Sequence, residues 1–73
     1  MKRIITYITI YYIKRKTGEV VYTNTNPNEF GKFVKEFLNL KVDTFPTYKV
    51  VKDKVRTNET DYVVGKKSME IEL

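Results

Sequence analysis

The 73-residue chain contains no cysteine, no histidine and no tryptophan, and it also lacks alanine and glutamine. Without cysteine there is no disulfide and no thiolate that serves as a nucleophile or a metal ligand. Without histidine the chain lacks the side chain that most often acts as a general base in catalysis. Ser68 is the single serine, and nothing in the sequence predicts a base beside it. We therefore expect a protein that is not an enzyme, with no catalytic residue, no metal site and no cofactor.

Long apolar runs are also absent, since a helix that crosses a bilayer needs about 20 consecutive apolar residues. The longest candidate is residues 4–13, IITYITIYYI, which includes two threonines and three tyrosines. No small-residue cleavage site of the kind that ends a secretory signal follows it. The sequence therefore predicts a cytoplasmic protein with no membrane segment.

The residues that are abundant favour strands. Isoleucine, valine and threonine together make up 24 residues, and β-branched side chains are typical of sheets. The absence of alanine argues against a helical bundle. Abundant lysine, asparagine, tyrosine and isoleucine with no alanine also indicate an AT-rich coding sequence, which is common in phages and mobile elements. The length predicts one domain that spans residues 1–73.

Residues 4–13 and 19–25 are expected to form an antiparallel hairpin. Gly18 stands where a three-residue loop with a G1 bulge requires a positive φ. A helix over residues 27–39 then follows, because Asn26 is a favourable N-cap and Pro27 suits the first helical position. Glu29 is placed to complete a capping box. The apolar stripe of this helix consists of Phe30, Phe33, Val34, Phe37 and Leu38.

The second half of the chain is predicted to be mostly strand. We expect a connector over 40–47, a strand over 48–56 and a turn over 57–60. A short strand over 62–64, a Gly-Lys-Lys turn and a last strand over 68–73 complete the chain. The predicted fold class is α+β, with an antiparallel sheet of four to five strands and one amphipathic helix packed on one face. The order of elements is ββα followed by two or three strands.

Both faces of the strand at residues 4–13 are apolar, so alternation alone does not identify the buried one. We expect Ile4, Ile8 and Ile10 to contact the helix. The opposite face then has no partner within the chain, and it carries Ile5, Tyr7, Tyr11 and Ile13. Because a contiguous exposed apolar patch usually marks an interface, we expect a homodimer.

The net charge of +5 is spread unevenly along the chain. Cations cluster after the first strand and in the segment 49–56, which alone carries +3. Aromatic residues alternate with these cations, which is the recipe for stacking bases and binding phosphates of a single strand. The predicted binding residues are Tyr7, Tyr11, Lys14, Arg15, Lys16, Lys52, Lys54 and Arg56. We therefore expect nucleic-acid binding, with a single strand favoured over a duplex.

The alternative is a protein–protein interaction module. Tyrosine and arginine are frequent hot-spot residues, so the same tyrosine-rich face, or an edge strand, would also suit a host protein that this chain inhibits or redirects. The sequence leaves these two classes of partner open.

Overall fold

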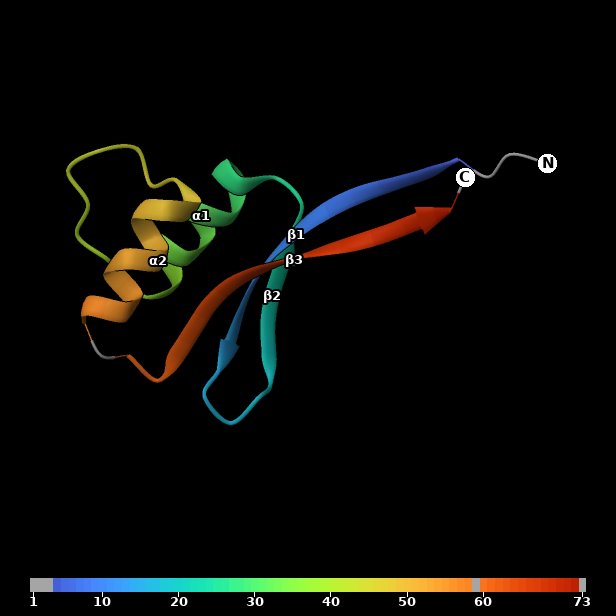
Figure 1. Ribbon diagram of the computed structural model, residues 1–73. Helices are drawn as coiled ribbons and strands as arrows, with labels where there is room; N and C mark the ends of the chain where they lie inside the picture. The colour runs from blue at the N-terminus through green and yellow to red at the C-terminus, as the bar shows by residue number, and fades with distance from the viewer. Residues whose placement is uncertain (1–3, 59, 73) are drawn as a thin grey trace.

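The structure is a computed structural model that describes residues 4–58 and 60–72. Its elements are β1 (Ile5–Arg15), β2 (Val20–Asn24), α1 (Pro27–Phe37), α2 (Tyr48–Thr57) and β3 (Tyr62–Glu72). The strands form one antiparallel sheet in the order β2-β1-β3. Both helices pack at one end of the sheet, while β1 and β3 run on together away from them (Figure 1).

The α+β class agrees with the sequence, but the predicted number of elements is wrong. The described chain has a three-stranded sheet and two helices, in place of four to five strands and one helix. The segment predicted as a strand over 48–56 is α2, and the two strands predicted over 62–64 and 68–73 are the single strand β3. Glu59 of the predicted turn and Leu73 of the predicted last strand lie outside the described residues.

Residues 48–57 form a helix because their apolar side chains have helical spacing and their first turn is capped. Tyr48, Val51 and Val55 are buried at positions i, i+3 and i+7. The hydroxyl of Thr47 accepts a hydrogen bond from the backbone N–H of Val50 at 3.4 Å, which is an N-cap contact. The abundance of valine favoured a strand in the sequence, and burial of this stripe against the sheet overrides that propensity.

β3 runs without interruption through the segment predicted as a turn. It pairs with β1 over the whole length of both strands, from Ile5 opposite Glu72 to Arg15 opposite Tyr62. Gly65 lies opposite Tyr12, and the Tyr12 ring occupies the space next to it. Here the glycine permits close packing of an aromatic ring across the strands, so it does not mark a turn.

The first hairpin is confirmed. Gly18 has a φ of 109°, and its N–H donates to the Arg15 carbonyl at 2.8 Å. The Arg15 N–H in turn donates to the Glu19 carbonyl at 2.8 Å, which closes a three-residue loop. The register shifts by one residue beside Ile13, as expected for a bulge next to such a loop.

The N-cap of α1 is also confirmed, although the capping box is not formed. The Asn26 side chain accepts from the N–H groups of Asn28 at 2.9 Å and Glu29 at 3.1 Å. The N–H of Asn26 donates to the Asn24 side chain at 2.8 Å, where a capping box would use Glu29. The helix ends at Phe37, two residues before the predicted end.

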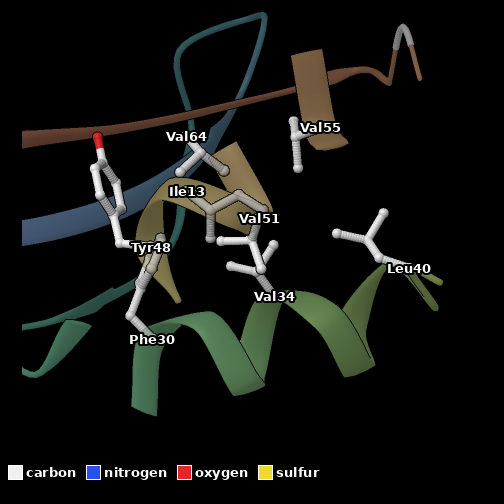
Figure 2. Close-up of a cluster of buried hydrophobic side chains, with 8 residues drawn as sticks. All are labelled: Ile13, Phe30, Val34, Leu40, Tyr48, Val51, Val55 and Val64. Atoms are coloured by element: carbon white, nitrogen blue, oxygen red, sulfur yellow. The ribbon is translucent and has the colours of Figure 1, made fainter. Parts of the chain in front are cut away.

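The core lies between the helices and the half of the sheet nearest to them. Figure 2 shows Ile13 of β1 and Val64 of β3 pointing toward the side chains of α1 and α2. Phe30 and Val34 of α1 are fully buried there.

The prediction of which face of β1 is buried is wrong. Ile13 and Tyr11 face the helices, whereas Ile8 and Ile10 lie on the opposite face of the strand. The reversal follows from the apolar character of both faces, which leaves the choice to tertiary packing.

β1 and β3 continue well past the core as a two-stranded ribbon, which we call the arm (residues 5–10 and 67–72). β2 pairs with β1 only from Tyr11 to Lys14, and neither described helix reaches the arm (Figure 1). The chain measures 51 × 29 × 16 Å, so it is three times as long as it is thick. Its surface therefore has two distinct regions, a head that holds the core and an arm that is one sheet layer thick.

Candidate functional site

A basic groove runs along the head where α2 meets β3. α2 packs on the sheet through Val51 and Val55, and two hollows of about 600 and 710 Å³ open on the outer side of this contact. The hollows are adjacent, since Lys52 and Arg56 line both, and we call the two together the α2–β3 groove. The charged residues that line it are Lys16, Lys49, Lys52, Asp53, Arg56 and Lys66.

The charge of this lining is strongly positive. It contains five cations and one acid, Asp53, so the net charge of the lining is +4. Asp53 pairs with Arg56 at 3.0 Å across one turn of α2, and both side chains are mostly exposed. An exposed pair of this kind contributes little stability, about 0–1 kcal/mol, and leaves the guanidinium accessible to a further anion. The groove is therefore suited to a ligand that carries several negative charges.

Tyr48 forms part of the floor of the groove and holds two of the lysines near its ring. The ammonium of Lys52 lies 5.7 Å from the ring centroid, and that of Lys66 lies 5.8 Å from it. Both distances are within the range of cation–π attraction, which contributes about 0.5–1 kcal/mol at such partly exposed positions. This contact brings together cations from α2 and β3 that are distant in the sequence.

The hydroxyl of Tyr48 is the unusual polar group of the floor. Tyr48 is 7% exposed, and its buried hydroxyl makes no hydrogen bond with the residues that the structure describes. A buried hydroxyl without a partner costs about 1–3 kcal/mol relative to a paired one. The ring also contacts Tyr11 with centroids 4.7 Å apart, so the two tyrosines pack against each other.

The two tyrosines predicted to stack on bases lie on one face of β1 but in different surroundings. Tyr11 lies in the head between Tyr48 and Phe30, and its centroid is 6.0 Å from that of Phe30. Tyr7 lies on the arm and is 69% exposed. The predicted sheet face of tyrosines and cations therefore does not form, because its second strand is the helix α2.

The three cations predicted to cluster at residues 14–16 lie in three different surroundings. The Lys14 ammonium lies 5.8 Å from the ring of Tyr12, on the face of the sheet opposite the helices. Arg15 pairs with Glu19 at 3.7 Å across the hairpin loop. Lys16 is the member of the cluster that lines the α2–β3 groove.

Of the three predicted binding cations in residues 52–56, two line the groove and one does not. Lys52 and Arg56 are one helical turn apart, so both face the groove. Lys54 lies about 200° around the helix from Lys52 and points away from this lining, exposed to solvent. The pattern of alternate residues in the predicted strand had wrongly placed all three on one face.

Two cations of the groove were missed in the sequence. Lys66 was assigned to the predicted turn at 65–67. Lys49 was assigned to the face of the predicted strand 48–56 that is opposite to Lys52 and Arg56. The helical spacing of Tyr48, Val51 and Val55 was the signal that would have placed Lys49, Lys52 and Arg56 on neighbouring parts of one helix.

Within the described ranges, no cluster of three or more carboxylate, histidine or cysteine residues has the geometry to hold a metal ion. None of the described helices has both the length and the apolar character needed to cross a membrane. A scan against protein-family models and searches of curated proteins and of solved structures found no match to this chain.

Proposed function

We propose that the protein binds nucleic acid in the α2–β3 groove. The observation that carries this proposal is the convergence of cations from three elements, Lys16 of the first hairpin, Lys52 and Arg56 of α2, and Lys66 of β3, along one groove. A row of cations at a concave surface matches the evenly spaced phosphates of a polynucleotide. The proposal includes a cytoplasmic location, where nucleic acid is accessible.

The proposed contact is with the sugar–phosphate backbone. The rings of Tyr11 and Tyr48 pack against each other, so they are not free platforms for bases. The affinity then depends on phosphate contacts, which makes it independent of base sequence and strongly dependent on salt. A single strand remains the form we propose, because a duplex is too wide to enter hollows of about 600 and 710 Å³.

Titration of a fluorescein-labelled oligonucleotide, followed by fluorescence anisotropy, tests the proposal. A single strand and a duplex of the same sequence are compared at about 50 mM and about 200 mM salt. With five phosphate contacts, the affinity for the single strand is expected to fall about 100-fold between these concentrations. Absence of binding to both forms at the lower concentration would exclude the proposal and favour a protein as the partner.

A pair of triple variants tests whether the groove is the site. Changing Lys52, Arg56 and Lys66 to alanine removes three cations from the groove, and changing Lys32, Lys41 and Lys54 removes three exposed cations from elsewhere. We expect the groove variant to bind the single strand about tenfold or more weakly. The control variant is expected to stay close to wild type. Equal losses in the two variants would show that net charge alone, and no defined groove, determines binding.

A further inference from the structure

The chain as a whole exposes more surface than a compact monomer of its mass. The chain has an accessible area of 5714 Å² at a mass of 8.7 kDa, for which a compact monomer exposes about 4,700 Å². Its radius of gyration is 14.2 Å, whereas about 11 Å is usual for this length. The excess of about 1,000 Å² is close to the roughly 800 Å² that each partner of a stable dimer buries.

Exposed large apolar side chains occur on the arm and just before it. Tyr7 is 69% exposed, Ile5 is 46% exposed and Met69 is 44% exposed, and Ile4 just before β1 is 63% exposed. The core cannot take these side chains in, because both described helices pack on the other end of the sheet (Figure 1). Ile5 and Tyr7 lie on one face of the arm, and Met69, opposite Ile8, lies on the other, so the arm exposes apolar side chains on both faces. Apolar exposure of this kind on a small chain indicates a region that is covered in the functional state.

The arm has two edges, and only one of them carries the charges that usually prevent strand pairing. The edge formed by β3 has Lys67 and Glu70 along its length. The edge formed by β1 has the six uncharged residues ITYITI at 5–10, with neither proline nor glycine. Natural edge strands that must stay unpaired are protected by lysine, proline or a bulge, and this one lacks the first two and is regularly paired on its inner side.

The free part of the β1 edge also has definite limits. β2 begins to pair with β1 at Tyr11, opposite Asn24, and no described strand lies beside residues 5–10 on that side. Every second residue of this six-residue segment therefore points its backbone N–H and C=O toward the open side, next to the end of β2. A strand that pairs with this segment extends the sheet, and β2 limits the length of that pairing at one end.

We propose that this position is taken by the same segment of a second copy, so that two arms pair antiparallel through β1. A two-fold axis at Tyr7 places Ile4 opposite Ile10, Thr6 opposite Ile8 and Ile5 opposite Thr9 of the second copy. Every such pair joins uncharged side chains of high strand propensity, which stabilises a cross-strand pair. The two chains then share one continuous sheet, with their heads at opposite ends. This proposal does not depend on the nucleic-acid proposal.

Because the chain has no cysteine, single introduced cysteines report this contact directly. Opposite residues of an antiparallel pair have Cα atoms about 4.5–5.5 Å apart, which a disulfide spans. We expect the Tyr7→Cys variant to form a disulfide dimer almost completely under mild oxidation. The control is Ser68→Cys, an exposed position on β3 at a neighbouring level of the arm. Equal cross-linking of the two variants, or cross-linking of the control alone, would overturn pairing through β1.

A matched charge change tests the same interface in solution by sedimentation equilibrium. Tyr7→Lys places two like charges at the two-fold axis and is expected to weaken the dimer at least tenfold. Ser68→Lys adds the same charge at the β3 edge and is expected to leave the dimer unchanged. Tyr7 is exposed on each single chain, so circular dichroism should show both variants folded. A wild-type chain that stays monomeric at high concentration, or a dimer that Tyr7→Lys leaves intact, would refute the proposal.

Discussion

Gly31 of α1 lies directly against the backbone carbonyl of Pro46, in the connector that leads into α2. Any Cβ at residue 31 would overlap that carbonyl oxygen. The contact determines how closely the connector crosses α1, and hence where α2 begins. The atoms in contact are backbone atoms of both segments, so no rotation of a side chain relieves the overlap.

Gly31→Ala is therefore expected to destabilise the fold although alanine is the better helix former. Helix propensity alone predicts a gain of about 1 kcal/mol, whereas overpacking against backbone costs about 1–3 kcal/mol or more. Urea denaturation followed by circular dichroism should show a net loss of stability. Glu36→Ala, an exposed change on the same helix, is the control and should have little effect. An increase in stability for Gly31→Ala would mean that α1 and the connector are not in this contact.

Tyr12 and Gly65 form a second close pair, across β1 and β3. A Cβ on Gly65 would come within 2.5 Å of the Tyr12 hydroxyl oxygen, which is the far end of a movable side chain. We expect Gly65→Ala to cost less than Gly31→Ala, because the Tyr12 ring lies on the helix-free face and is able to turn away. In a Tyr12→Ala background the same change should cost nothing. A double-mutant cycle measures this coupling, and a coupling energy of zero would contradict the packing of ring on glycine.

These pairs show which parts of the fold were predictable from the sequence. The first hairpin and the start of α1 depend on local chemistry, the positive φ of Gly18 and the side-chain cap from Asn26, and both were predicted. Gly65 gave the wrong prediction because its reason lies in Tyr12, more than fifty residues away in the sequence. A glycine required by a distant ring has the same local appearance as a glycine required by a turn.

The candidate site was predicted only in part for a similar reason. Lys16, Lys52 and Arg56 were among the predicted binding residues, and all three line the groove. They meet there because residues 48–57 are a helix, a choice that depends on the burial of Val51 and Val55 against the sheet. The prediction for Tyr11 was wrong because both faces of β1 are apolar. The orientation of the strand is then determined by the helices, which cover one of these faces.

The unpaired hydroxyl of Tyr48 leads to a prediction about stability. Tyr48→Phe removes a buried polar group that has no described partner and keeps the ring beneath Lys52 and Lys66. We expect the free energy of unfolding to stay the same or to rise by about 1 kcal/mol. Tyr22→Phe is the matched control, since its hydroxyl accepts a hydrogen bond from Asn24 at 2.8 Å and its loss should cost about 1 kcal/mol. A larger loss for Tyr48→Phe than for Tyr22→Phe would show that the Tyr48 hydroxyl has a partner in solution.

The salt dependence of oligonucleotide binding provides the most direct test of individual groove residues. Each lysine that neutralises a phosphate of a single strand contributes about 0.7 to the slope of log K against log salt concentration. Lys52→Ala should lower this slope by about that amount, because Lys52 lines both hollows of the groove. Lys54→Ala removes the same charge from the same helix two residues away, on the side that faces solvent, and should leave the slope unchanged. An equal change in slope for the two variants would mean that the strand does not lie in the α2–β3 groove.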